Sequence, residues 1–232
     1  MDIRGKVVLV TGANRGLGKA FVSALLEAGA AKVYAGARNP ASVDIPGSTP
    51  IALDITDAAS VQHAAQQCRD VSVVINNAGF LQYGSLLAED SVENLQQHFD
   101  VNTFGTLRVS RAFAPILAGQ GGGALINVLS VLSWLSPPGT GGYSTSKSAQ
   151  WGLTNGLRGE LRAQGTLVIG VHPAYIDTDM VADVQAPKST PQEVVALTLQ
   201  ALAEGREEVL VSDTSHGVKA SLSTDSPVYL NH

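Results

Sequence analysis

The sequence predicts an α/β fold, a doubly wound parallel sheet of about seven strands with helices on both faces. Short runs rich in valine and isoleucine alternate along the chain with longer segments of helical period. Continuous apolar runs joined by long crossovers are typical of parallel strands that are buried on both faces. The strand candidates are Val7–Val10, Val33–Ala35, Ile51–Leu53, Val73–Ile75, Leu125–Val128, Leu167–Val171 and Val209–Val211.

The last long helix carries the clearest start signal. Thr190 can cap it, Pro191 suits its first position and Glu193 completes a capping box. We therefore expect this helix to run to about Glu204. A helical pattern also runs from Lys19 to Ala28.

Length and composition indicate one domain. The 232 residues, 44% of them hydrophobic, are enough for one sizeable core, and no segment resembles a linker. We expect residues 1–212 to form the domain and residues 213–232 to be its polar C-terminal tail. The tail has only a weak helical signal at Val218–Leu222, and it either closes the sheet edge or is partly disordered.

Charge and cysteine content exclude several classes of function. The net charge is -5 and lysine and arginine do not cluster, which argues against a nucleic-acid or membrane surface. Cys68 is the single cysteine and the five histidines are scattered, so we expect neither a disulfide framework nor a metal site.

The chain shows no targeting or membrane signal. The first strand candidate lies so close to the initiator methionine that no room is left for a signal peptide, so we expect a cytoplasmic protein. The longest apolar-rich run, Ala124–Leu135, is interrupted by polar residues and falls short of the ~20 residues that span a bilayer.

A glycine-rich turn follows the first strand directly. The segment Thr-Gly-Ala-Asn-Arg-Gly-Leu-Gly occupies residues 11–18, and a helical pattern comes after it. Its glycines permit a tight turn and close backbone approach, while amides at the helix N-terminus face a pyrophosphate. This strand–turn–helix context predicts a Rossmann-type dinucleotide site. The residues expected to contact the dinucleotide are Gly12, Asn14, Arg15, Gly16, Leu17 and Gly18.

Tyr143 and Lys147 form a second signal, because their spacing places a phenol and an ammonium on one helix face. A neighbouring cation favours the phenolate, so we expect Lys147 to lower the pKa of Tyr143 from its usual ~10 toward neutrality. Considered alone, the two residues indicate no more than a solvated pair on a helix surface.

Together these motifs resemble the short-chain dehydrogenase/reductase family, in its compact single-domain branch. Thr-Gly-x-x-x-Gly-x-Gly is that family's glycine pattern, and Asn76-Asn77-Ala78-Gly79 is similar to its Asn-Asn-Ala-Gly segment. Asn102 corresponds to the family's helix asparagine, and Ser130 precedes Tyr143 by thirteen residues, as the family's catalytic serine does. The resemblance spans residues 6 to about 211.

The resemblance implies roles for four catalytic residues. Reduction of a ketone needs donors aimed at the carbonyl oxygen and one proton to deliver. Ser130 would polarise the carbonyl, and Tyr143 would donate the proton. Lys147 would also hold the nicotinamide ribose, and Asn102 would order a water beside it.

The end of the second strand indicates which cofactor is preferred. The segment Tyr34–Arg38 contains no acidic residue that would bind a ribose hydroxyl and repel a 2′-phosphate. Arg38 can instead grip a phosphate, and Arg15 supplies a second cation. In the family, basic residues at these two places accompany a preference for NADP, so we expect NADP(H) to be preferred and NAD(H) to be possible. Two ordinary solvent-facing arginines are the alternative.

Further cofactor contacts are implied by the resemblance. Asp54 would contact the adenine edge with the backbone of Ile55 beside it, although Asp54 could instead cap a helix. The family's Asn-Asn-Ala-Gly segment assigns Asn77, Ala78 and Gly79 to the cofactor as well.

The segment after the sixth strand is similar to the family's Pro-Gly-x-x-x-Thr segment beside the nicotinamide. Pro173 begins it, and the backbone of Ile176 and the hydroxyl of Thr178 would hold the carboxamide. Ala174 replaces the usual glycine, which would introduce strain if that position needs a positive φ.

The candidate substrate lining is apolar and aromatic, without a cation for an acidic substrate. Only about a dozen residues separate Thr178 from Thr190, so we expect an open site that takes neutral ketones, aldehydes or alcohols with bulky groups. Each lining residue could instead belong to the core. The candidates are Phe80, Tyr83, Trp134, Tyr175 and Met180.

Three functions fit these observations. The first is an NADPH-dependent carbonyl reductase that needs no metal. The second is an NAD-linked alcohol or hydroxysteroid-type dehydrogenase with the same catalytic residues, and the third is a non-catalytic NADP(H)-binding sensor. Relatives in the family commonly pair through two long helices, here 92–117 and 143–163, which implies a homodimer or homotetramer.

Overall fold

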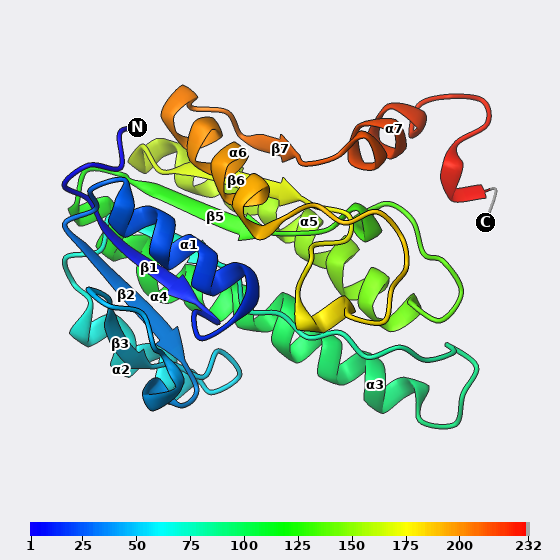
Figure 1. The fold of residues 1–232 in the computed structure, drawn as a ribbon, viewed down its shortest axis with the longest axis horizontal. Helices are drawn as coiled ribbons and strands as arrows, with labels where there is room; N and C mark the ends of the chain where they lie inside the picture. The colour runs from blue at the N-terminus through cyan, green and yellow to red at the C-terminus, as the bar shows by residue number, and fades with distance from the viewer. Residues whose placement is uncertain (231–232) are drawn as a thin grey trace.

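The computed structural model describes residues 1–230 and contains one seven-stranded sheet in the order β3-β2-β1-β4-β5-β6-β7 (Figure 1). Every neighbouring pair of strands is parallel, which confirms the predicted doubly wound sheet. Each strand candidate overlaps an observed strand. The strands are β1 Val7–Thr11, β2 Lys32–Ala37, β3 Thr49–Ala52, β4 Val73–Asn76, β5 Ala124–Val128, β6 Leu167–His172 and β7 Glu208–Leu210.

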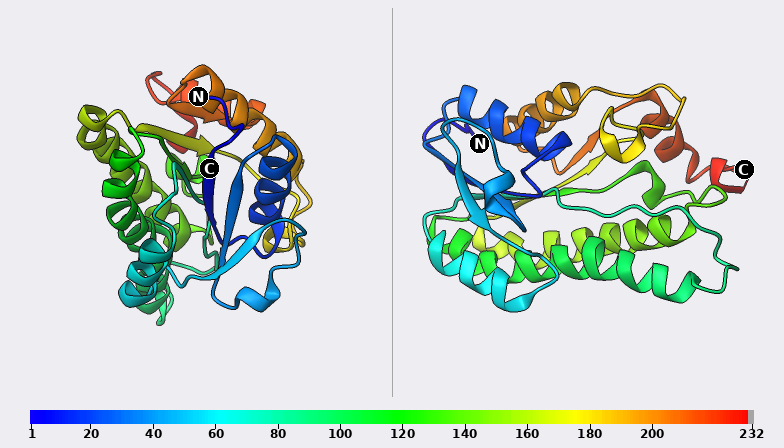
Figure 2. Two further views of the ribbon diagram at one scale, coloured as in Figure 1. Left: turned by 90° about the vertical axis from the view of Figure 1, so that its left-hand side faces the viewer. Right: turned by 60° about the horizontal axis from the view of Figure 1, so that its bottom comes forward.

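Helices cover both faces of the sheet (Figure 2). Helices α1 and α6 pack together on one face, and α2, α4 and α5 lie on the other. The capping box of α6 is present as predicted, and this helix ends at Glu204. The helices are α1 Gly16–Glu27, α2 Ala58–Gln67, α3 Ser91–His98, α4 Thr106–Gly119, α5 Gly141–Leu161, α6 Pro191–Glu204 and α7 Asp213–Ser221. Among residues 1–230, none of the helices combines the length and the apolar character needed to cross a membrane.

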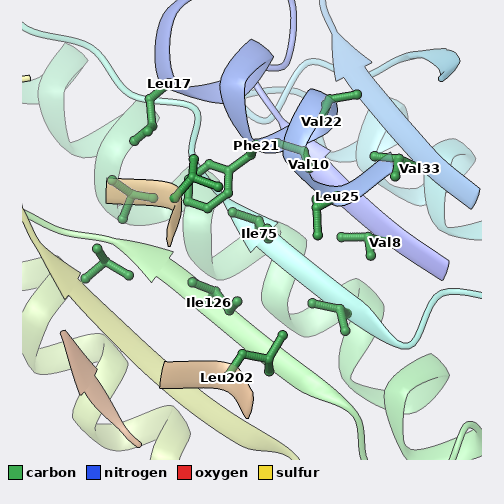
Figure 3. Packing of buried hydrophobic residues seen from close by; sticks show 14 of the residues in the cluster. Val8, Val10, Leu17, Phe21, Val22, Leu25, Val33, Ile75, Ile126 and Leu202 are labelled. Atoms are coloured by element: carbon green, nitrogen blue, oxygen red, sulfur yellow. The ribbon is translucent and has the colours of Figure 1, made fainter. Parts of the chain in front are cut away.

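The core has one layer on each side of the sheet. On the first side, Phe21 and Leu25 of α1 and Leu202 of α6 pack against the strand residues Val8 and Ile126 (Figure 3). The second layer joins α2, α4 and α5 to the opposite face of the strands. Burial of large apolar side chains on both faces explains why the strands read as continuous apolar runs.

The strand order reverses at β1, which pairs with β2 on one side and with β4 on the other. In open parallel sheets, ligands bind outside the carboxyl ends of the strands at such a switch point. Two segments leave the sheet at this edge. They are the turn after β1 and the segment after β4.

The helix predicted over residues 92–117 is interrupted. Helix α3 runs into a π-helical segment, η2, at Phe99–Gly105, and α4 continues from Thr106. A side chain at Gly105 would force Ile55 to shift, because a Cβ would lie 2.6 Å from Cδ1 of Ile55. Apolar periodicity alone does not distinguish such a segment from a continuous α-helix.

The C-terminal tail forms a helix, and it begins earlier than the sequence predicts. Ser212 caps α7 by accepting a hydrogen bond from the backbone of Ser215. Val218 packs with Val131 and Trp134, so the helix docks beside the segment that follows β5. The last two residues of the predicted tail lie outside the described residues.

Candidate active site

The turn between β1 and α1 is built for close approach of a ligand. Helix α1 begins at Gly16, and Arg15 at its N-cap makes no capping hydrogen bond through its side chain. Gly12 has a φ of 64°, and a Cβ on Gly18 would lie 2.1 Å from the carbonyl oxygen of Gly12. The backbone amides at this helix start therefore fit a pyrophosphate. Leu17 is buried in the core and offers the site only its backbone (Figure 3).

The segment after β4 holds this turn in place. The side chain of Asn77 donates to the carbonyl oxygens of Thr11 at 2.9 Å and Gly12 at 3.2 Å. The Thr11 hydroxyl accepts from the amides of Asn77 and Ala78, both at 3.0 Å. Asn77 thus shapes the glycine turn, and Thr11 is a positioning residue that the sequence analysis did not single out.

Two arginines lie at the carboxyl edge of the sheet. Arg15 precedes α1 and Arg38 follows β2, and the bond from Ala13 N to Gly36 O (3.0 Å) joins their two segments. Both side chains are exposed, and neither forms an ion pair with any residue of the described range. A phosphate could therefore approach both guanidinium groups.

Asp54 lies at the same edge, after β3. Burial raises its pKa, but the hydroxyl and amide of Thr56 (2.7 and 2.9 Å) and the nearby charge of Arg38 bring the net shift below the ordinary value. The alternative role of Asp54 as a helix cap is wrong, because Asp57 caps α2. Ile55 is buried beside Asp54.

Ser130 and Tyr143 come together from different elements. Ser130 follows β5, is buried, and accepts from the amide of Leu132 at 3.1 Å. Helix α5 carries Tyr143 in its first turn, and its Ser148 donates to the carbonyl oxygen of Ser133 (2.8 Å), which holds the two segments together. The Ser130 hydroxyl acts on the Tyr143 phenol as a hydrogen-bonding partner.

The pKa values of the tyrosine and the lysine differ from the expectation. Burial raises the pKa of Tyr143 to about 12, against an opposing effect of the Ser130 hydroxyl. Burial also lowers the pKa of Lys147 to about 7. The Lys147 ammonium lies 5.7 Å from the centre of the Tyr143 ring. Removal of both groups from water outweighs their mutual attraction here, because burial disfavours each charged form.

Asn102 lies in the π-helical segment η2 and uses its side chain to hold the chain after β4. Its amide nitrogen donates to the carbonyl oxygen of Phe80 (2.9 Å), and its amide oxygen accepts from the Phe80 nitrogen (2.8 Å). The backbone carbonyl of Asn102 accepts from the Thr106 hydroxyl at 2.9 Å. Gly79 passes close by, since a Cβ there would lie 3.5 Å from the Asn102 oxygen.

The segment after β6 completes the site. Pro173 is buried, and its carbonyl accepts from Val131 N (2.8 Å), beside Ser130. Thr178 meets the glycine turn, because a Cβ on Gly16 would lie 3.3 Å from its methyl carbon. Ala174 carries no strain of the kind considered above, since none of the non-glycine residues in the range 1–230 has a positive φ.

The residues proposed to line the substrate side differ in their exposure and in what they contact. Tyr83 and Met180 are 51% and 46% exposed, and Tyr83 lies near both Tyr143 and Tyr175. Phe80 packs on the ring of His98, with centroids 4.8 Å apart. Tyr83 therefore lies beside Tyr143, and Phe80 reaches it through the His98 ring.

Trp134 belongs to the core and not to this lining. It is 8% exposed, stacks on His172 at a centroid separation of 4.1 Å, and packs with Val131 and Val218. The position of an aromatic residue soon after Ser130 gives no sequence signal that distinguishes these two placements.

Two buried histidines near the site were missed by the sequence analysis. His98 binds the carbonyl of Asn94 through Nδ1 (2.8 Å) and accepts from Gln82 N through Nε2 (3.1 Å), which fixes it as a neutral ring. His172 on β6 contacts the carbonyl of Ser130 through Nδ1 at 3.3 Å. Both histidines therefore support segments that carry site residues.

His172 should make stability depend on pH. Burial lowers the pKa of His172 to about 4 from its ordinary 6.5. Its contribution is therefore complete above pH 6.5 and is lost as pH falls toward 4, at up to about 1.4 kcal/mol per pH unit. Urea unfolding between pH 6.5 and about 4 should show that His172→Phe, which keeps a ring stacked on Trp134, loses less stability than the unmodified protein. The exposed His63→Gln should retain the original pH dependence, and a slope unaltered in His172→Phe would contradict this assignment.

The arrangement supports proton transfer at a polar group of a bound ligand. A hydroxyl, a phenol and an amine converge at the carboxyl edge of the sheet, next to a turn that fits a dinucleotide. In the part of the chain that the structure describes, no three or more His, Cys, Asp or Glu side chains are grouped so as to hold a metal ion.

Comparison with known proteins gives a consistent result. The family model for short chain dehydrogenases matches residues 6–189. A short chain dehydrogenase of Monascus ruber is 36% identical over 78% of this chain and 65% of its own length. A 3alpha-hydroxysteroid dehydrogenase of Mediterraneibacter gnavus is 32% identical over 89% of this chain and 85% of its own.

Solved structures agree. A short chain dehydrogenase from Burkholderia cenocepacia J2315, determined in complex with NADP, superposes with a TM-score of 0.93. It is 40% identical, and the match covers 97% of this chain and 95% of that one.

Proposed function

Since this chain belongs to the short-chain dehydrogenase family of oxidoreductases, we propose that it is an NADPH-dependent carbonyl reductase, which converts ketones and aldehydes reversibly to alcohols. The observation that carries the proposal is the convergence of Ser130, Tyr143 and Lys147 beside the glycine turn. An NADP(H)-binding sensor would not need these three groups together.

The residues of this chain supply the proton chemistry. Tyr143 is protonated at neutral pH, because burial raises its pKa to about 12, so it can donate a proton to the carbonyl oxygen. Ser130 can donate a hydrogen bond to the same oxygen. As the phenol loses its proton, a charged Lys147 stabilises the phenolate that develops.

The cofactor is proposed from the fit of the glycine turn and the two free arginines. Gly12–Gly18 would hold the pyrophosphate, Arg15 and Arg38 a 2′-phosphate, and Thr178 and Ile176 the carboxamide. When bound, the nicotinamide supplies the hydride that reduces the carbonyl carbon. The Burkholderia cenocepacia relative, solved with NADP, supports this assignment.

The cofactor preference can be measured directly. We expect kcat/KM to be higher with NADPH than with NADH, and Arg38→Asp to reverse the preference because a carboxylate repels the 2′-phosphate and binds a ribose hydroxyl. Loss of one charged contact should cost NADPH about tenfold or more in kcat/KM. Arg69→Asp, on the loop after α2, controls for the change of charge. Preference for NADH in the unmodified protein would instead support the NAD-linked dehydrogenase.

The substrate is proposed to be a neutral carbonyl compound with a bulky apolar group. Phe80 and Tyr83 offer aromatic surface beside Tyr143, and Tyr175 and Met180 would extend it. A panel of aryl ketones, steroid ketones and acyl thioester ketones, followed by NADPH absorbance, tests this class. Turnover of carboxylate-bearing ketones alone would contradict it.

We propose further that the chain forms a homodimer or homotetramer through α4 and α5. Phe104 and Leu107, where η2 meets α4, are 48% and 38% exposed in the single chain. Exposed large apolar residues at one place favour burial against another subunit. Light scattering of the purified protein measures its oligomeric state.

A further inference from the structure

Gln150 stands out because it is a fully buried polar residue next to Lys147. It lies three residues after the lysine on α5, so the two side chains share a helix face. The Lys147 ammonium donates to the Gln150 side-chain oxygen at 2.8 Å and to the carbonyl oxygen of Val128 at 2.8 Å. Two of its three protons are thus held by the protein, and one remains for a ligand.

The orientation of the Gln150 amide is fixed from its other end. Its nitrogen donates to the Thr106 hydroxyl at 2.8 Å, and that hydroxyl donates its proton to the carbonyl of Asn102 at 2.9 Å. Thr106 can therefore only accept from Gln150, which turns the amide oxygen toward Lys147. This chain of bonds connects Asn102 with Lys147 through side chains of the protein.

The groups around Lys147 include few that titrate. Tyr143 is on the same helix, with its ring centre 5.7 Å from the ammonium. The ring of His98 on α3 lies 6.2 Å from the Tyr143 ring between centres, and Tyr83, in the segment after β4, lies near Tyr143. None of these is an acid that could compensate a buried ammonium at neutral pH.

The other segments packed near Lys147 also present no charge to it. Strand β5 contributes the Val128 carbonyl, and Asp100 on η2 is paired with Arg108 at 2.7 Å. Within residues 1–230, no acidic side chain lies within ion-pair distance of Lys147. The protein therefore stabilises the ammonium through two neutral oxygen atoms, those of the Val128 carbonyl and the Gln150 side chain.

From this geometry we infer that Gln150 is a positioning residue for the reaction, which holds Lys147 in place and in its charged form beside Tyr143. A hydrogen bond to the charged form of a group favours that form. The Gln150 oxygen that faces Lys147 carries no proton of its own, unlike a hydroxyl or a water, so Gln150 holds the lysine without relaying its proton toward Asn102. The role in turnover rests on the proposed function, whereas the effect on Lys147 does not.

The test follows the titration of Lys147 itself, by NMR of protein carrying 13C at lysine Cε, without cofactor or substrate. Six lysines give few signals, and Lys147→Arg identifies the one that matters. Gln150→Met keeps the volume but removes the acceptor, so it should lower the pKa of Lys147 by about one unit. Gln150→Glu restores an acceptor with negative charge and should raise it.

Thr106→Val provides a second route if Gln150→Met does not fold. It removes the anchor of the amide and should shift the Lys147 titration in the same direction by less. Thr198→Val on α6 is its matched control, because Thr198 also donates to a carbonyl four residues earlier, at 2.7 Å to Val194, but far from the site. A Lys147 titration unchanged in Thr106→Val and Gln150→Met, or moved alike by Met and Glu, overturns the inference.

Measurement of turnover provides a second, independent test of the role of Gln150. In Gln150→Met, kcat for carbonyl reduction at pH 7 should fall about tenfold while KM for the carbonyl changes little, because the lost charge matters as the phenolate develops. Gln150→Glu should recover part of this loss. If the unmodified protein reduces no carbonyl, the proposed function fails while the NMR titration still decides the role of Gln150. If turnover is present but kcat is unaffected in Gln150→Met, the catalytic part of the inference fails alone.

Discussion

Replacing Tyr143 by phenylalanine is expected to lower kcat for carbonyl reduction by about 10²–10⁴, the range that a positioned general acid contributes. The change removes only the phenolic oxygen, so the ring can keep its edge contact with His98 at 6.2 Å. NADPH binding, followed by its fluorescence, should stay within about twofold, since Tyr143 is assigned to proton transfer and the glycine turn to cofactor affinity. This separation is what distinguishes an enzyme from a sensor.

Tyr34→Phe is the matched control for Tyr143→Phe. Tyr34 is also largely buried, but its hydroxyl lies 2.9 Å from Asp70 and 3.1 Å from Lys32, at the opposite end of β2 from Arg38. Its loss should cost about 1 kcal/mol of stability and leave kcat unchanged. Equal kcat in Tyr143→Phe and the unmodified protein would remove Tyr143 from the mechanism.

The second large effect is expected from Gly18→Ala. The added Cβ would lie 2.1 Å from the Gly12 carbonyl oxygen and 2.6 Å from the Asn77 side-chain nitrogen, so the turn must shift. The shift would break the bonds from Asn77 that hold the turn and move the amides at the start of α1. We expect a loss of about 1–3 kcal/mol in the free energy of unfolding and at least about tenfold weaker NADPH binding.

Gly217→Ala in α7 separates this steric effect from the general effect of a methyl group. A Cβ at Gly217 meets no atom within 4 Å, so this change should stabilise the helix by up to about 1 kcal/mol and leave NADPH affinity unaltered. Urea unfolding and a fluorescence titration measure both quantities. If Gly18→Ala behaves like Gly217→Ala, the glycine turn does not have the assigned role.

The sequence predicted those features whose signals are local. Strands such as Val73–Asn76 and Leu167–His172 are recognisable because burial on both faces demands unbroken apolar runs. The capping box at Thr190 and Glu193 is encoded within four residues, and the structure contains it as expected. The glycine spacing likewise reports a turn whose close contacts only glycine allows.

The features that escaped prediction depend on residues far apart in the chain. The π-helical segment at Phe99–Gly105 contains Asn102, which bonds to Phe80, twenty-two residues away. The bond between Gln150 and Thr106 spans forty-four residues, and periodicity within either helix contains no trace of it. The stacking of Trp134 on His172 is of the same kind, which is why Trp134 was assigned to the substrate side.

Spacing also failed to predict the electrostatics of the Tyr143 and Lys147 pair. The four-residue interval correctly indicates one helix face, but it contains no information on how deeply that face is buried. Burial raises the pKa of the phenol and lowers that of the amine, which is opposite to the mutual stabilisation that a solvated pair would show. Depth within the fold decides this balance.

The bridge between Ile176 and Ser189 closes the stretch of chain between them into a self-contained loop. Asp177 N donates to Ser189 O, and Ser189 N donates to Tyr175 O, both at 2.9 Å, so the two ends of this stretch are fastened to each other. A stretch closed at its own base can be exchanged as a cassette, longer or shorter, without changing the register of any strand. For the proposed reductase, substrate range should therefore be open to redesign by grafting within residues 179–188, which leaves Thr178 and the proton-transfer residues in place.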